Sequence, residues 1–202
     1  IVLTIALASA LLSAIVLYGF GVMQETQNRN QKTAQIMYHA ISEQQGQELY
    51  KQEEIAWVGE FFNAFSEQVN HSTVNFTYAN ADMLKSQSMP YSGDLPASEN
   101  EIVVQESLLD SLGYSNELGQ TIQIPFSDGT THDFKLTGIL DVKTGDIGRY
   151  TAIISKELVR QQYGDEGMID YYIGLKGAQN MSEEEATNYA STLAQQLEIS
   201  DD

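Results

Sequence analysis

The first 24 residues constrain this chain most, because they contain no charged side chain. Ile, Leu, Val and Ala dominate the segment, and small polar residues, glycines and two aromatic residues interrupt it. A helix of this length, at ~1.5 Å of rise per residue, is about 35 Å long, and a bilayer's hydrocarbon core is roughly 30 Å thick. Residues 1–23 are therefore predicted to form a transmembrane helix. Tyr18 and Phe20 fit an aromatic belt at its outer interface.

A signal peptide and a buried core helix are the two other interpretations of this segment. Ala8-Ser9-Ala10 has the composition of a cleavage site, but the apolar run continues to Val22, too far for a signal peptide. A buried core helix of this length without one charge is rarer than a membrane span. Because the chain begins at Ile1 rather than Met, we expect it to be a fragment or a processed piece.

The rest of the chain is strongly acidic. It contains 28 Asp and Glu against 10 Lys and Arg, and the formal net charge is −18. So acidic a surface argues against binding nucleic acid or anionic headgroups, both of which require basic patches. The chain has no cysteine, which excludes disulfides, thiol chemistry and Cys-ligated metal. We expect no cofactor and no nucleic-acid partner.

Residues 24–35 are polar and contain no Pro or Gly. A polar segment without a helix breaker, directly after a span, is predicted to continue the helix as a stalk that stands out of the membrane. A flexible linker is the equally open alternative.

Residues 36–62 have the pattern of a β-α-β unit. Ile36–Ile41 is predicted to be a strand, and Ser42 with Gln45 forms a capping-box pattern at the start of a helix. Ile55–Phe62, which is apolar and aromatic, is predicted to be the second strand. A half-buried strand around residue 76 and a loop-like segment over residues 82–98, in which Met83 and Leu84 can form a helical turn, complete this part of the chain.

Short strands cluster between Glu101 and Ser155 and predict a small barrel-like β subdomain. A Leu-rich helix within it should end at Gly113, and Asp128-Gly129 is a strong hairpin signal. A strand, a helix capped by Ser155, an alternating strand and a helix with a Ser182/Glu185 capping box should follow.

The predicted fold class is α+β. A transmembrane and stalk helix precedes a mixed α/β porter-like subdomain of strand-helix-strand units, into which a small β-rich subdomain is inserted. In chain order, the predicted organisation is a transmembrane helix at 1–23, a stalk at 24–35, the first part of the porter-like subdomain at 36–98, the insert at 99–149, and the second part at 150–202.

No residue set has the spacing of a catalytic or metal site. His39, His71 and His132 lie far apart, and none lies on a predicted helix with a second His or acidic residue four positions later. Asp141 and Asp146 bracket a turn that lacks the further acidic ligands of a calcium loop. No catalytic, cofactor-binding or metal-binding residue is predicted, and the chain is predicted not to be an enzyme.

The remaining polar motifs have ordinary explanations. Glu183–Glu185 lies at a predicted helix N-terminus, where negative charge is favourable. Asn70, Asn75 and Asn180 begin glycosylation sequons, a short pattern that often occurs by chance.

The order of several short motifs resembles the extracytoplasmic domain of MacB/FtsX-type ABC transporter permeases. The motifs are Gly93-x-x-Pro96, Asn100-Glu101-Ile102-Val103-Val104, the Leu-rich helix Leu108-Leu109 to Leu112-Gly113, Leu118-Gly119-Gln120-Thr121-Ile122, and Leu136-Thr137-Gly138-Ile139. Tyr38-His39-Ala40 after a first membrane helix fits the Gram-positive members.

The resemblance implies a cell-membrane protein whose residues after about 24 lie outside the cytoplasm. Its expected partners are membrane lipid, a cytoplasmic ABC ATPase subunit or domain, a second permease copy or half, and an exported substrate or extracytoplasmic partner. Such permeases pass ATP-driven motion through the stalk to the outer domain. A ligand-sensing domain of a single-span receptor and a membrane-anchored hydrolase with paired carboxylates are the alternatives. Further membrane spans after residue 202 would favour the permease.

Overall fold

The computed structural model describes residues 33–142, 149–164 and 169–199. The predicted transmembrane helix and all but the last three residues of the predicted stalk lie outside these ranges. Within the described ranges, no helix is long and apolar enough to cross a membrane.

The strands are β1 Ile36–Ile41, β2 Ile55–Val69, β3 Ser72–Ala79, β4 Tyr91–Gly93, β5 Glu101–Gln105, β6 Thr121–Pro125, β7 Thr131–Leu140, β8 Arg149–Ile154 and β9 Ile169–Leu175. The helices are α2 Glu43–Leu49, α3 Ala81–Ser86, α4 Glu106–Leu112, α5 Lys156–Tyr163, the 3-10 turn η1 Ala178–Asn180 and α6 Glu183–Gln196.

All nine described strands belong to one mixed sheet. Their order is β1-β9-β2-β3-β8-β5-β7-β4, and β6 pairs with β7. β9 is antiparallel to both β1 and β2, so β1 and β2 run parallel to each other on either side of it. The predicted β-α-β unit is therefore present in split form. The mixed α and β class is confirmed, and the domain boundaries at residues 98 and 149 stay predictions.

Local sequence signals set the ends of the helices. Ser42 and Ser182 each accept a hydrogen bond from the N3 backbone N–H, and the N3 side chain accepts from the cap's own N–H, so both predicted capping boxes are confirmed. Gly113 ends α4 with a φ of +78°, a conformation that costs Gly nothing.

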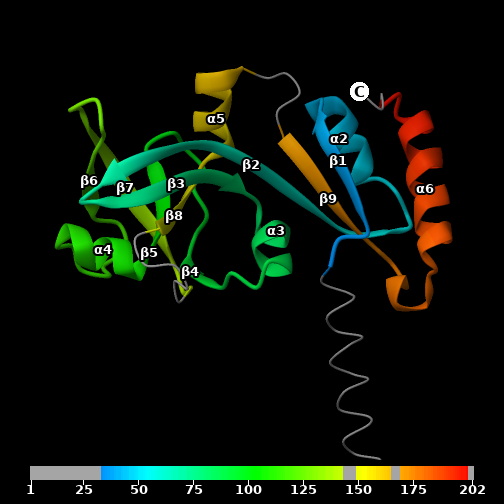
Figure 1. Cartoon of the computed structure of the whole chain (residues 1–202), viewed down its shortest axis with the longest axis horizontal. Helices are drawn as coiled ribbons and strands as arrows, with labels where there is room; N and C mark the ends of the chain where they lie inside the picture. The colour runs from blue at the N-terminus through cyan, green and yellow to red at the C-terminus, as the bar shows by residue number, and fades with distance from the viewer. Residues whose placement is uncertain (1–32, 143–148, 165–168, 200–202) are drawn as a thin grey trace, which may run out of the picture.

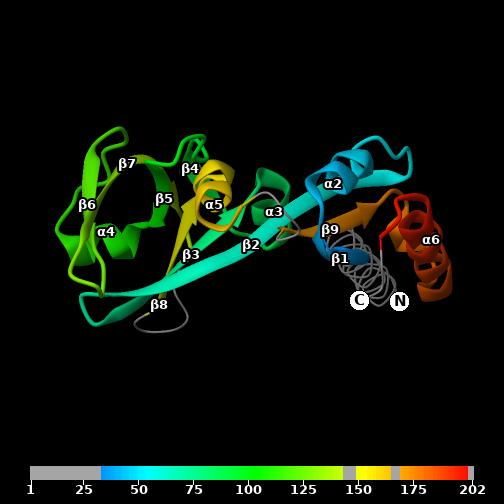
Figure 2. The same ribbon diagram turned by 90° about the horizontal axis from the view of Figure 1, so that it is seen from above.

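The hairpin of β2 and β3 is the longest element of the sheet, and β2 alone has 15 residues. Asn70 and His71 form its turn with φ values of +47° and +67°, as a tight hairpin turn requires. The pairing register shifts between Asn63 and Phe65, which marks a β-bulge. The strand was expected to span only the apolar and aromatic run Ile55–Phe62. Figure 2 shows β2 running along most of the molecule.

Two hydrophobic cores lie along this hairpin, and Figure 1 shows the two groups of elements around them. We call the first group the terminal lobe, because it holds both ends of the described chain: β1, α2, the first part of β2, β9 and α6. Its buried core includes Leu49, Tyr171 and Leu193. Helix α6 contributes Leu193 and Ala194 to this core.

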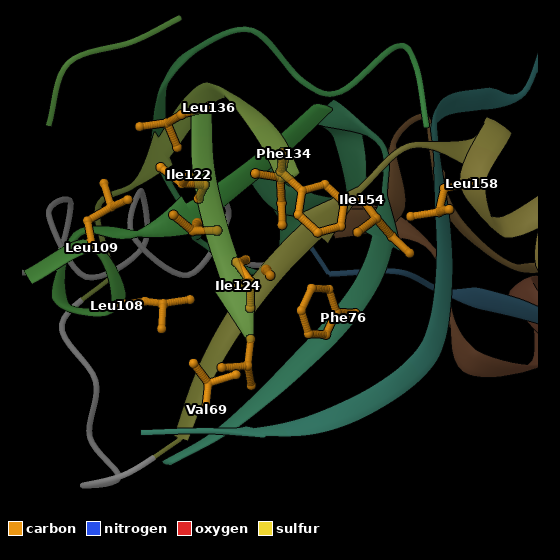
Figure 3. Packing of buried hydrophobic residues seen from close by; sticks show 14 of the residues in the cluster. Val69, Phe76, Leu108, Leu109, Ile122, Ile124, Phe134, Leu136, Ile154 and Leu158 are labelled. Carbon is orange, nitrogen blue, oxygen red and sulfur yellow. The ribbon is translucent and has the colours of Figure 1, made fainter. Parts of the chain in front are cut away.

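The second group, which we call the distal lobe, comprises the far end of the β2–β3 hairpin with β5, α4, β6, β7, β8 and α5. Phe76 stacks on Phe65 with ring centroids 4.6 Å apart, and Phe126 meets both rings edge-on. Figure 3 shows the labelled side chains converging from the hairpin, from α4 and from β6, β7 and β8. A third, smaller cluster lies under α3, which forms where a helical turn was expected at Met83 and Leu84.

Candidate functional site

The most unusual side chain in the described structure is a buried carboxylate, Glu60 on β2, which is only 5% exposed. Three donors converge on it. Tyr50 and Tyr78 donate their hydroxyls at 2.7 and 2.6 Å, and the Lys156 ammonium lies 2.9 Å away. A buried charge is tolerated only when it is paired and hydrogen-bonded, and both conditions hold here.

Strand register brings these groups together. Glu60 lies directly opposite Tyr171 on β9, and Tyr78 projects from the neighbouring strand β3. Tyr50 is the residue that ends α2, and Lys156 is the first residue of α5. The site thus joins side chains from α2, β2, β3 and α5, of which Lys156 on α5 is 96 residues away from Glu60 in the sequence.

A second carboxylate extends the cluster between two helices. Glu43, the first residue of α2, accepts hydrogen bonds from the Arg160 guanidinium on α5 and lies 3.3 Å from the Lys156 ammonium. Partial burial raises the pKa of Glu43, but the Arg160 hydrogen bond and the charge of Lys156 outweigh it and hold that pKa below its ordinary value. Glu43 therefore stays ionised and links α2 to α5.

Asn80, the N-cap of α3, ties a third helix to the same place. Its side-chain oxygen accepts from the backbone N–H of Met83 and of Glu60, and its amide donates to the Val58 carbonyl at 2.9 Å. Asn80 therefore fixes the backbone of β2 at Val58 and Glu60 and joins it to α3.

Tyr171 packs tightly beneath α2. A Cβ atom on Gly46 would lie 2.2 Å from the Tyr171 ring, so only glycine permits this approach. The Tyr171 hydroxyl is buried and has no hydrogen-bond partner among the described residues. Burial first, and then the nearby charge of Glu60, raises its pKa, so the phenol stays neutral.

The cluster has the properties of a structural bridge. Burial and Glu60 also raise the pKa values of Tyr50 and Tyr78, so neither phenol is a ready base. Glu60 and Glu43 converge on Lys156, as the hydrolase alternative requires of two carboxylates, but both carry cationic partners. We name the set Glu60, Glu43, Lys156 and Arg160 the polar bridge. The prediction that the chain is not an enzyme stays a prediction.

The bridge lies where the two lobes meet. Phe62 and Tyr78 pack against both cores, and Tyr78 is itself a ligand of Glu60. The β2 bulge at Asn63–Phe65 follows directly after these positions. The polar bridge, the aromatic residues Phe62 and Tyr78, and the β2 bulge therefore lie together at the junction of the two lobes.

The histidines and aspartates considered from sequence are not brought together. His39 is exposed on β1 and pairs with Asp170 at 2.5 Å, whereas His71 lies in the hairpin turn. His132, on β7, stacks on Phe126. Asp141 follows β7, and Asp146 is outside the described residues. The described part of the chain holds no group of three or more potential metal ligands.

Sequence reasoning missed the polar bridge. The one local signal was a carboxylate on the inward face of a strand, between Val58 and Phe62. Its partners could not be inferred, because they depend on β9 lying between β1 and β2 and on α5 lying beside α2.

Three solved structures share this fold. The periplasmic region of MacB from Actinobacillus actinomycetemcomitans aligns with 15% identity and a TM-score of 0.54, covering 80% of this chain and 74% of that one. The extracellular domain of the noncanonic ABC-type transporter YknZ from Gram-positive bacteria gives 11% identity and a TM-score of 0.52, covering 75% and 83%. A domain of a putative permease from Porphyromonas gingivalis gives 10% and 0.51, covering 74% of each chain.

These similarities define the fold class, a mixed α/β sheet domain like that of the MacB periplasmic region. The sequence matches the MacB-like periplasmic core domain family over residues 1–189, so the chain belongs to that family. The resemblance to MacB/FtsX-type ABC transporter permeases, inferred above from motif order, is confirmed. No curated protein matches the sequence.

Proposed function

We propose that this domain transmits motion, driven by a cytoplasmic ABC ATPase, to a substrate or partner outside the membrane, and that it does so without catalysing a reaction itself. One observation carries the proposal. The first described strand, β1, follows directly on the predicted stalk and belongs to the same continuous sheet as the distal lobe.

The end of the predicted stalk is hydrogen-bonded to the sheet. The backbone N–H of Gln35 donates to the Ile173 carbonyl at 2.9 Å, and the Leu175 N–H donates to the Gln35 side chain at 2.8 Å. A displacement of the stalk would therefore reach β9, then its neighbour β2, and through β2 both cores. In this proposal the transmembrane helix occupies residues 1–23, and the insert at 99–149 moves with the distal lobe.

The partners follow from the family. A MacB/FtsX-type system implies an ABC ATPase partner, and we further propose a second permease copy or half, a membrane location with this domain outside, and a Gram-positive source. Three further membrane spans after residue 202, if the complete gene encodes them, would support the permease. A single span followed by a signalling domain would identify a receptor instead.

The test inserts two glycines beside Asn30 in the full-length permease, assembled with its ATPase in lipid nanodiscs. Because the chain has no cysteine, a fluorophore on Thr131→Cys, an exposed position of the distal lobe, can report energy transfer to a labelled lipid headgroup. Each helical glycine costs about 1 kcal/mol relative to alanine and loosens the rod.

We expect ATP to change the transfer efficiency in the parent, and expect the glycine insertion to abolish that change while ATP hydrolysis continues. Inserting two alanines is the matched control, because it adds the same length and keeps the helix. An unchanged signal in the parent, or a full response in the glycine variant, would refute mechanical transmission.

A further inference from the structure

A groove lies on the face of the sheet opposite the polar bridge, at the same position along the hairpin. It has a volume of about 360 Å³, within the range of small-molecule sites. Strands β2, β3, β8 and β9 form its floor, and α3 forms one wall. The described residues that line it are Phe61, Asn63, Asn75, Thr77, Ala79, Met83, Leu84, Gln87, Met89, Thr151, Ile153 and Tyr172.

None of these described lining residues is charged, although the chain's net charge is −18. The same holds for an adjoining depression of about 440 Å³, which shares Gln87 and Tyr172 with the groove. It is lined by Thr33, Ala34, Gln35, Ile36, Met37, Ser86, Gln87 and Tyr172. An uncharged lining offers an ion no partner for its charge, so this groove favours a neutral occupant.

The groove also presents uncharged polar groups that the described protein does not use. Asn63 lies directly opposite Thr77 on the neighbouring strand, and Asn75 lies directly opposite Thr151. The side chains of Asn63, Thr77 and Thr151 make no hydrogen bond to any described residue. Thr77 as a whole is only 5% exposed, so it lies at the bottom of the groove rather than at its rim. These groups can both donate to and accept from a ligand.

The apolar part of the lining surrounds these polar groups. Phe61 and Tyr172 meet edge to face with ring centroids 6.3 Å apart. Met83 and Met89 come from α3 and the segment after it, and unbranched methionine side chains adapt to ligands of different shape. Apolar walls with a few placed polar groups are the usual composition of a ligand pocket.

We propose that this groove binds an uncharged, amphipathic small molecule. Its ring or chain would lie against Phe61, Tyr172 and the methionines, and its polar groups would hydrogen-bond to Asn63, Thr77 and Thr151. The inference does not depend on mechanical transmission, because it concerns binding alone.

The groove has a built-in reporter. Trp57 is the only tryptophan of the chain. A Cβ atom on Gly59 would lie 3.2 Å from both the Trp57 ring and the Met83 sulfur, so the indole is beside a lining residue. Energy transfer from Trp57 to a bound fluorophore therefore reports binding near this part of the domain, and variants of the lining residues then locate the site.

The test uses two probes that differ only in charge: neutral N-phenyl-1-naphthylamine and its sulfonated, anionic analogue 1-anilinonaphthalene-8-sulfonate. The full chain is studied in nanodiscs, and the signal lost in a Trp57→Phe variant is taken as specific. We expect saturable transfer to the neutral probe, with at least tenfold weaker binding of the anionic one.

Two variants locate the site. Thr151→Phe should fill the groove and weaken neutral-probe binding about tenfold or more, and Asn63→Asp should weaken it severalfold. Gln68→Glu is the matched control, because it makes the same amide-to-carboxylate change on the same strand outside the groove and should have no effect. Equal binding in all variants, equal affinity for both probes, or a signal that survives Trp57→Phe would overturn the proposal.

Discussion

The core side chains of the two lobes are buried to different degrees. In the distal core, 12 of the 15 described buried side chains are 0% exposed. In the terminal core, only three of 12 are, and most of the others are 2–9% exposed. The distal core is also stacked with aromatic rings, whereas the terminal core relies on aliphatic side chains with Tyr38 and Tyr171.

This contrast indicates different mechanical roles for the two lobes. Local opening is easiest where apolar burial is incomplete, and elements that move are drawn from such regions. The terminal lobe receives the predicted stalk, so the less tightly sealed core lies where motion would enter. The distal lobe, with its closed core, would then respond as a rigid body.

The largest effect should come from the distal core. Phe76→Ala removes a fully buried ring that stacks on Phe65, and the resulting cavity should lower the free energy of unfolding by about 4 kcal/mol. Ile36→Ala, at 6% exposure in the terminal core, should cost only about 2 kcal/mol. Urea unfolding of the full chain in detergent micelles measures both values. Equal losses of unfolding free energy in the two variants, or losses in the reverse order, would show that the difference in exposure between the two cores does not affect stability.

The next effect tests the junction. Lys156→Met leaves the Glu60 carboxylate buried without its cation, and breaking a buried pair in this way costs about 3 kcal/mol. The double variant Glu60→Gln with Lys156→Met should recover part of that loss, because no unpaired charge remains. Hydrogen exchange should also show faster exchange at the junction of α2 and α5. If the loss of unfolding free energy in the double variant equals the sum of the losses in the two single variants, the two residues do not act as a pair.

Sequence reasoning succeeded where the signal was local. The capping boxes at Ser42 and Ser182, the glycine that ends α4 and the Asp128-Gly129 hairpin all depend on residues within one turn of each other. Propensity and hydrogen-bonding capacity specify these features without reference to the rest of the molecule.

It failed where pairing between distant segments decides the outcome. The polar second half of β2 is a strand because β3 pairs with it along its length. The helical turn expected at Met83 and Leu84 extends to the helix α3, because Asn80 caps it. The polar bridge and the uncharged groove both require the order of β9, β2, β3 and β8 in the sheet, which no local pattern encodes. Motif order alone pointed to the family, because shared descent preserves sequence features that local physics does not predict.

The smallest predicted effect compares two helix caps of the same chemistry in the two lobes. Ser155 caps α5 in the distal lobe and is 1% exposed, and its hydroxyl accepts from the Leu158 N–H at 3.1 Å. Ser182 caps α6 in the terminal lobe, where its hydroxyl accepts from the exposed Glu185 N–H at 3.2 Å. Removing either hydroxyl leaves one backbone N–H without its acceptor. Water can take the place of that acceptor only at the exposed cap. Ser155→Ala should therefore cost about 2 kcal/mol and Ser182→Ala about 1 kcal/mol or less, in the same urea experiment. Ser→Thr at each site, which keeps the hydroxyl, serves as the control. If the exposed cap proves the costlier of the two, burial does not set the strength of these caps, and the contrast between the lobes does not extend to their hydrogen bonds.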